Sequence, residues 1–317
     1  MSAELERGAG IEAEREPTDS SDGAVEIGSL RLDHPVINGS GTFDAIAARR
    51  AFGDELLARF PFAAFVSKTI TPEPRVGNPP PRLFETPSGM INSIGLPNKG
   101  LAGFLEQDLP QLGELPVPLV VSVMATDREG FARLVGEVGA RDEVAAIELN
   151  VSCPNVKSGL IVGEQPSETL ALCEALRPLT PKPLIVKLTP NTADPAAVAL
   201  AAEQGGADAV SLINTLRATA LDPRSGEPWL GAGSGGLSGP AVRPVALDQV
   251  RRVAREVSVP VIGMGGIESG ADALDFLALG ASAVAVGTAN FRDPGAGARV
   301  RDELEGLRGH APALHLN

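Results

Sequence analysis

The sequence predicts a (β/α)8 barrel with long loops at the C-terminal face of its strands, on three observations. Eight short apolar runs recur along the chain, most are followed by a segment with helical spacing of apolar residues, and several are apolar on both faces. Runs such as LIVKL and AVAVG are typical of parallel strands that helices cover on both sides. Strand alternating with helix eight times over about 290 residues favours a closed barrel.

Each expected strand is bounded by turn residues. In chain order the strands are Pro35–Asn38, Ala64–Thr69, Leu119–Met124, Ala146–Ser152, Leu184–Thr189, Ala209–Thr215, Val261–Gly266 and Ala283–Ala289. Apolar residues three and four apart predict helices over Arg128–Val138, Ser167–Leu176, Asp194–Glu203, Val245–Val257 and Asp272–Leu279. Gly206 and Gly280 each end a helical segment just before an apolar strand, a pattern used twice. The rival fold, an open doubly wound sheet, is disfavoured because no G-x-G-x-x-G follows the first strand.

Composition excludes several classes of protein. Of 317 residues, 43% are apolar and 21% charged, which is typical of a soluble globular chain, and the net charge of −13 disfavours nucleic acid and anionic membranes as partners. We find no run of about 18 apolar residues and no signal-peptide pattern, so a cytoplasmic protein is expected. Two cysteines cannot supply an iron–sulfur cluster, so any such cluster must belong to a partner.

The first residues differ from the rest in composition. Residues 1–22 hold seven acidic and two basic residues and almost no large apolar side chain, which is typical of a disordered tail. We therefore expect an acidic tail over residues 1–24 and one catalytic domain over residues 25–317.

Three connecting segments are unusually long. Ile70–Gly100 and Leu216–Val242 exceed ordinary loop lengths, and Pro154–Pro166 carries two glycines that could act as hinges. Loops of this size are usually lids or binding walls. We expect them at the C-terminal face of the barrel, where chemistry in this fold gathers.

The ends of the expected strands are polar or rich in glycine. They offer, in order, Asn38–Ser40, Ser67–Thr69, Ser122, Asn150–Asn155, Lys187, Asn214–Thr215, Gly265–Gly266 and Gly287–Thr288. A purely structural barrel has no reason to end two internal strands in lysine. Together these residues predict a catalytic site at the carboxyl ends of the strands.

The last two strands predict an anion site. GMGGI and GTAN place small residues at strand ends, where backbone N–H groups can approach a phosphate, and GGLSG precedes them on the long loop. The ligand could be a phosphorylated substrate or a cofactor such as FMN.

The two cysteines have different surroundings. Cys173 shares the apolar face of a helix with Leu170 and Leu176, which predicts a buried, inert thiol. Cys153 lies at a strand end within Asn150-Val-Ser-Cys-Pro-Asn155, where a thiol could act as nucleophile, base or acid.

The chain resembles class 1 dihydroorotate dehydrogenases, FMN enzymes on a (β/α)8 barrel that oxidise dihydroorotate to orotate in pyrimidine synthesis. The motifs NVSCPN, NSIGLPN, SKT, KLTPN, INT, GGLSGP, GMGGI and VGTANF stand in the family's order, and the resemblance covers about residues 25 to 305. It implies that Cys153 takes the proton from C5 of dihydroorotate while the C6 hydride passes to flavin N5.

The resemblance also implies two sets of binding residues. Substrate would contact Lys68, Asn92, Ser93, Ile94, Gly95, Leu96, Asn150, Asn155, Asn214 and Thr215. FMN would contact Ser40, Lys68, Thr69, Ser122, Asn150, Lys187, Ile213, Gly239, Gly265, Gly266, Gly287 and Thr288. Ser122 departs from the family, which often has Asn there. The residue types suit these roles: amides match the donors and acceptors of orotate, Lys68 would face its carboxylate, and Lys187 would face flavin N1. No metal ligand is expected.

NVSCPNVKSGLIVGEQ most resembles the class 1B form, which implies a partner subunit carrying FAD and a 2Fe–2S cluster, NAD as final acceptor, and a homodimer at the core of a heterotetramer. The class 1A form, a fumarate-reducing homodimer, is an alternative. A barrel lyase or isomerase with a phosphorylated substrate stays open and would lack yellow colour. A non-catalytic scaffold is disfavoured because Cys153, Lys68 and Lys187 are all present.

Overall fold

The central sheet has eight parallel strands, as expected. The structure, a computed structural model, describes residues 23–152 and 162–310. The strand order is β3-β14-β13-β10-β9-β8-β7-β4. The strands are β3 (Val36–Asn38), β4 (Phe65–Val66), β7 (Leu119–Val123), β8 (Val144–Asn150), β9 (Leu184–Lys187), β10 (Ala209–Leu212), β13 (Val261–Met264) and β14 (Ala283–Val286). Each lies within or beside its predicted run, so the (β/α)8 prediction is confirmed.

The two edge strands of this sheet, β3 and β4, are joined by a side chain. Asn38 Nδ2 donates to the Val66 carbonyl oxygen at 2.8 Å, and Asn38 Oδ1 accepts from the Val66 N–H at 2.8 Å. The Ala63 N–H donates to the Val36 carbonyl nearby. Asn38 therefore pairs with β4 as a strand backbone would, and the sheet closes.

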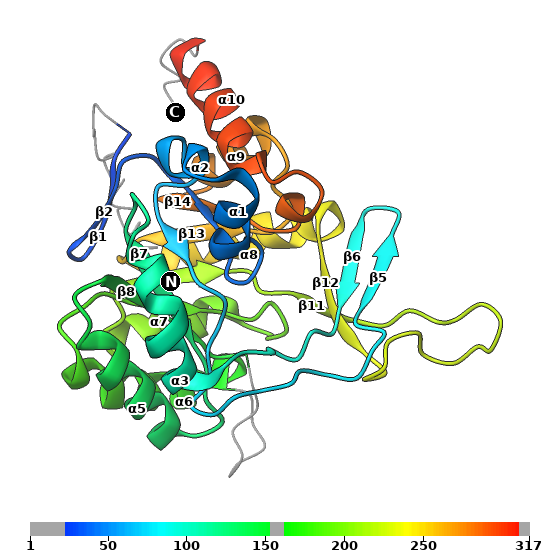
Figure 1. Cartoon of the computed structure of the whole chain (residues 1–317), viewed down its shortest axis with the longest axis horizontal. Helices are drawn as coiled ribbons and strands as arrows, with labels where there is room; N and C mark the ends of the chain where they lie inside the picture. The colour runs from blue at the N-terminus through cyan, green and yellow to red at the C-terminus, as the bar shows by residue number, and fades with distance from the viewer. Residues whose placement is uncertain (1–22, 153–161, 311–317) are drawn as a thin grey trace, which may run out of the picture.

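Helices surround the sheet (Figure 1). They are α1 (Ala45–Phe52), α2 (Glu55–Ala58), α3 (Gly100–Gly103), α4 (Leu109–Leu112), α5 (Arg128–Gly139), α6 (Pro166–Leu176), α7 (Pro195–Gln204), α8 (Arg243–Glu256), α9 (Gly270–Ala278) and α10 (Ala296–His310). Shorter turns are η1 (Phe104–Asp108), η2 (Val162–Glu164), η3 (Arg177–Leu179), η4 (Pro240–Val242) and η5 (Thr288–Phe291). Asp127, Asp194 and Ser269 cap α5, α7 and α9 through side-chain oxygens, which satisfies N–H groups of the first turn.

Two local predictions are confirmed. Cys173 is 1% exposed on α6, and burial raises the pKa of its thiol to about 12, so it is inert near neutrality. Gly206 and Gly280 follow α7 and α9 with φ of +93° and +101°, the left-handed conformation that ends helices. Among the described helices, none is long and apolar enough to span a bilayer.

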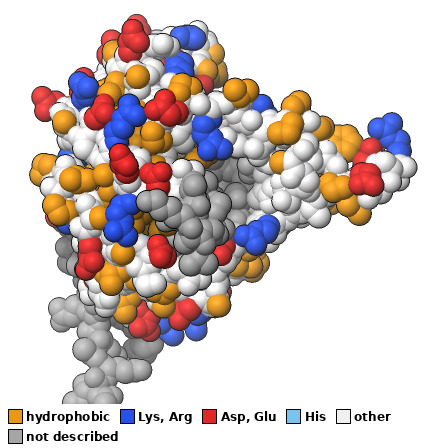
Figure 2. Space-filling view, turned by 90° about the horizontal axis from the view of Figure 1, so that it is seen from below, with side chains coloured by type: hydrophobic (Ala, Val, Ile, Leu, Met, Phe, Trp, Pro, Cys, Tyr) orange, Lys and Arg blue, Asp and Glu red, His pale blue; other side chains and the backbone are white. Residues whose placement is uncertain are grey.

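The two long segments do more than form loops. They pair as an antiparallel sheet in the order β11-β12-β6-β5, made of β5 (Leu83–Thr86), β6 (Gly89–Asn92), β11 (Leu216–Ala218) and β12 (Gly235–Ser238). We call this sheet with its connecting turns the arm, and it projects from the barrel (Figure 1). Figure 2 shows hydrophobic side chains along the arm and charged ones at its tip; Leu83 and Leu221 are 52% and 56% exposed.

A hairpin covers the N-terminal end of the barrel. It consists of β1 (Val25–Ile27) and β2 (Leu30–Leu32). Ile27, Leu30 and Leu32 are buried and pack with strand residues such as Ala146 and Ile185. The predicted acidic tail lies outside the described residues, apart from its last two positions, so its boundary stays a prediction.

Candidate active site

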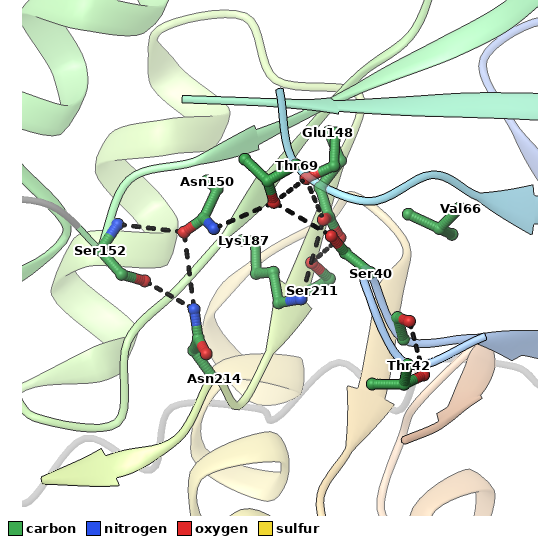
Figure 3. A network of polar contacts seen from close by, with 12 residues as sticks. Ser40, Thr42, Val66, Thr69, Glu148, Asn150, Ser152, Lys187, Ser211 and Asn214 are labelled. Atoms are coloured by element: carbon green, nitrogen blue, oxygen red, sulfur yellow. Dashed lines mark hydrogen bonds and ion pairs between the residues drawn. The ribbon is translucent and has the colours of Figure 1, made fainter. Parts of the chain in front are cut away.

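The strand ends bring together most of the predicted polar side chains. In register, Asn150 of β8 lies beside Lys187 of β9, and Lys187 lies beside Ser211 of β10. Figure 3 shows these side chains converging with Thr69 and Ser40 from the segments that follow β4 and β3. The site is therefore built at the carboxyl ends of the barrel strands, as predicted.

Lys187 is a buried cation with one acidic neighbour. Its side chain is 8% exposed, and its Nζ lies 3.7 Å from Oε1 of Glu148, whose side chain is 5% exposed. Among the described residues these two are the only buried ionised side chains. A buried charge is costly unless it is paired, so the two residues stabilise each other.

Glu148 holds a chain of hydroxyl groups. Its Oε1 accepts from Ser122 Oγ at 2.9 Å and its Oε2 from Ser211 Oγ at 3.3 Å. Ser122 Oγ is 2.9 Å from Thr69 Oγ1, which is 3.1 Å from Ser40 Oγ. Ser122 is fully buried beneath the site, so its hydroxyl faces the carboxylate and Thr69.

Sequence reasoning missed Glu148. A signal was available, because one acid interrupts the apolar run Val144–Asn150, and Glu148 has the same parity as Asn150. Alternate residues of a strand face the same side, so Glu148 belongs with the site.

Amide side chains meet near Lys187, which lies in register with Asn150. Asn214 Nδ2 donates to Ser152 Oγ at 2.9 Å and approaches Asn150 Oδ1 at 3.5 Å. Asn150 Nδ2 reaches Thr69 Oγ1 at 3.4 Å, and the Thr215 N–H donates to Asn214 Oδ1 at 2.8 Å. These contacts unite predicted residues from the ends of β4, β8 and β10 in one cluster.

The predicted segment Asn92–Leu96 begins on the arm. Asn92 Nδ2 donates to the Gly236 carbonyl at 3.3 Å, and Ser93 Oγ accepts from Asn78 Nδ2 at 2.9 Å. Gly95 has φ +75° and Leu96 has φ +53°, so the backbone turns sharply here. Asn98, which sequence reasoning did not select, fixes this turn by donating to the Leu96 carbonyl and to Thr71 Oγ1, both at 2.9 Å.

Lys68 differs from Lys187 in being exposed. It lines an open groove of about 780 Å³ with Gly41, Thr42 and Asn98. No hydrogen bond or ion pair of its ammonium group is found among residues 23–152 and 162–310. Its charge is therefore free to meet an anionic ligand.

Glycines from two loops gather near Thr288 of a third. Gly239, Gly265 and Gly266 have φ of +91°, +132° and +75°. A Cβ on Gly266 would lie 2.9 Å from the Gly239 carbonyl oxygen, and one on Gly239 would lie 3.5 Å from Thr288 Cγ2. Thr288 Oγ1 donates to Ser238 Oγ at 2.9 Å. Where the sequence predicts a phosphate, the backbone therefore adopts conformations that favour glycine and carries no Cβ atoms.

Two further residues that the sequence predicts to contact the cofactor, Ile213 and Gly287, lie near these loops. The buried Ile213 lies against Gly265, whose Cβ would be 3.3 Å from Ile213 Cγ1. Gly287 follows β14 next to Gly39 of the first strand's loop. Cys153 and Asn155 lie outside the described residues, so their predicted roles rest on sequence.

Fold and site together define a (β/α)8-barrel enzyme that gathers a buried cation, amide side chains and glycines at the carboxyl ends of its strands. The sequence profile described as dihydroorotate dehydrogenase matches residues 23–307. The chain therefore belongs to the dihydroorotate dehydrogenase family of oxidoreductases.

Individual relatives agree. The protein from Desulforudis audaxviator named dihydroorotate dehydrogenase B (NAD(+)), catalytic subunit, is 47% identical over 286 residues, covering 89% of this chain and 91% of that protein. The protein of that name from Geobacillus kaustophilus is 45% identical over 276 residues, 86% of each chain. A solved structure of the Eimeria tenella enzyme in complex with ferulenol aligns with TM-score 0.72 and 25% identity over 95% of this chain and 87% of that one.

Proposed function

We propose that this chain is the FMN-binding catalytic subunit of an NAD-linked dihydroorotate dehydrogenase, which oxidises dihydroorotate to orotate in the cytoplasm for pyrimidine synthesis. One observation carries the proposal: Lys187 is a buried cation that ends β9 in register with Asn150 of the amide cluster. A cation in a water-poor site favours negative charge on a bound group.

The residues present fit FMN. Gly239, Gly266 and Thr288 lie close together on three loops, and backbone free of Cβ atoms can approach a phosphate closely. Lys187 would face the flavin ring, and Ser40, Thr69 and Asn150 offer hydroxyl and amide groups beside it. Gly265, Gly287 and Ile213 would bound the same pocket.

The substrate fits the amide side of the site. Orotate is a planar anion edged with donors and acceptors, and amide groups supply both kinds of partner. Asn92, Asn150, Asn214 and Thr215 would bind the ring with Asn155, while Lys68 would neutralise the carboxylate. Ser93 to Leu96 would close over it through their backbone.

Oxidation of dihydroorotate removes a proton from C5 and a hydride from C6. When bound, FMN supplies the acceptor for the hydride. Cys153, the base that the family resemblance implies, would take the C5 proton. Lys187 would hold its positive charge beside the cofactor as electrons arrive.

The two electrons would leave through a partner. The relatives are named NAD(+) enzymes and catalytic subunits, which supports a separate electron-transfer subunit. This chain has two cysteines, too few for a four-thiolate cluster. We therefore assign FAD and a 2Fe–2S cluster to the partner, in a heterotetramer built on a homodimer of this chain.

Two experiments test the proposed function. Acid should release FMN from the yellow purified protein; release of FAD, or a colourless protein, would contradict the proposal and favour the lyase or isomerase alternative. The isolated subunit should reduce artificial acceptors with dihydroorotate but use NAD poorly, and coexpression with the partner should restore NAD reduction. Fast turnover with fumarate by the isolated subunit would instead indicate the class 1A activity.

A further inference from the structure

Glu148 is the only acidic side chain within the described barrel strands, and the reaction outlined above does not use it. Its Oε1 lies 3.7 Å from Lys187 Nζ. We propose that Glu148 is a positioning residue, the counter-ion that balances the charge of Lys187 and holds its side chain at the cofactor site. The proposal rests on the FMN-binding function given above.

Lys187 needs a counter-ion because of where it lies. A cation removed from water tends to lose its proton unless an opposite charge is near. In the part of the chain that the structure describes, the only charged residue within two positions after a barrel strand is Lys68, which is exposed and of the same sign. The remaining neighbours labelled in Figure 3, Thr69, Asn150 and Ser211, are uncharged, and so is Ser122, which bonds to Glu148. Glu148 alone among them can balance the charge.

The carboxylate is itself fixed from two sides. Ser122 on β7 donates to one oxygen and Ser211 on β10 to the other. Hydrogen bonds to the ionised form of a carboxyl group favour that form. Because both oxygens are occupied, the carboxylate cannot rotate away from Lys187 without losing a bond.

The first experiment measures the pair by unfolding the full chain in urea. We compare Glu148→Gln, Lys187→Met and the double variant, each with and without added FMN. Each single change leaves a buried charge unpaired and should lower the folding equilibrium constant about 100-fold or more. The double variant removes both charges. Its folding equilibrium constant should be at least about tenfold higher than the value obtained by multiplying the two single effects. Additive effects would overturn the proposal.

The second experiment measures the reduction potential of bound FMN against pH. In Glu148→Gln the unbalanced Lys187 should lose its proton as pH rises, so the potential should fall relative to the unmodified protein. Loss of that proton should lower the preference for reduced FMN about tenfold. This corresponds to a fall of about 30 mV in the two-electron reduction potential. Glu106→Gln removes an exposed carboxylate and is the matched acid-to-amide control, with a profile parallel to that of the unmodified protein. A Glu148→Gln profile that superimposes on the unmodified one would refute the proposal.

The two experiments separate this proposal from the proposed function. If the protein binds no FMN, the function fails, and the unfolding cycle still decides on the ion pair. If FMN binds and the cycle is additive, the function stands and the role of Glu148 fails. If Glu148→Gln does not fold, a folded double variant supports the pairing, and an unfolded double variant contradicts it.

Discussion

Asn38 shows how one side chain can take the place of strand backbone. It is fully buried and bonds to both polar backbone groups of Val66 and to the Gly39 carbonyl. An amide suits this position because it is both donor and acceptor, like the peptide group it faces. The barrel therefore depends on a residue type that a hydrophobic pattern would not select.

Asn38→Asp keeps the size of the side chain but removes its donors. We expect a loss of about 2–4 kcal/mol in the free energy of unfolding at pH 7, because the Val66 carbonyl loses its partner and a charge is buried. Part of the loss should be recovered at acidic pH, where the carboxyl group binds a proton. Urea denaturation at both pH values measures the free energy of unfolding. Gln107 is exposed, so Gln107→Glu is the matched amide-to-acid control. Equal stability of the two variants would contradict the closing role of Asn38.

The predicted base is tested by Cys153→Ser. A hydroxyl is a far weaker base than a thiol of the same shape, so flavin reduction by dihydroorotate should slow about 10²- to 10⁴-fold at pH 7. Stopped-flow absorbance gives the rate, and FMN content and orotate affinity should stay near those of the unmodified protein. The deficit should shrink at higher pH. A near-normal rate at neutral pH would show that another group takes the proton.

At the scale of elements, the arm brings part of the predicted substrate site to the barrel. Its strand β12 brings Gly236 against Thr215, where a Cβ would lie 1.9 Å from Thr215 Oγ1. The same strand pairs with β6, which carries Asn92. Packing of the arm thus sets the positions of two predicted substrate residues.

Gly236→Ala should displace Thr215 and weaken orotate binding about tenfold or more, with FMN retained. Orotate titration of the flavin spectrum measures this affinity. Gly136→Ala on α5 is the control, since its Cβ meets no atom within 4 Å, and it should leave affinity unchanged. Equal orotate affinity of the two variants would contradict this role of the arm in positioning Thr215.

His34, in the turn between β2 and β3, makes stability depend on pH. Burial, followed by the charge of Arg301, lowers the pKa of its imidazole from 6.5 to about 4. Its Nδ1 accepts from the Val36 N–H at 3.3 Å, which requires that nitrogen to be unprotonated. Below pH 6.5 the unfolded chain binds a proton that the folded chain does not, so stability falls as pH falls from about 6.5 to 4.

After discounting for partial exposure, this effect should amount to about 1–3 kcal/mol. His34→Gln should flatten the pH dependence of the unfolding free energy between pH 4 and 7 by that amount. Denaturant titrations at several pH values measure it. A variant with the same slope as the unmodified protein would assign the pH dependence to other groups.

For the whole molecule, local pattern predicted the barrel but not the arm. The eight strands carry their own signal, because each is a compact apolar run with polar ends. The arm strands are three or four residues long, and β12 is Gly-Gly-Leu-Ser, so neither alternation nor propensity marks them. They form because segments far apart in sequence, near residues 92 and 236, pair with each other.

The residues of the site, like the fold, were predicted from the sequence only in part. Strand ends and family motifs identified Lys187, Asn150 and Asn214, which the structure brings together. The pairing of Glu148 with Lys187 and the barrel-closing contact of Asn38 needed the packed structure, since which side chains meet depends on strand register. Cys153 and Asn155 remain predictions from sequence.

We infer that dihydroorotate delivers its electrons to FMN bound in this barrel. Anaerobic mixing of the purified protein with dihydroorotate tests it most directly, with flavin absorbance and orotate measured together. We predict that the yellow colour bleaches and that one orotate forms for each FMN reduced. A flavin that stays oxidised, or bleaching without orotate, would contradict the account.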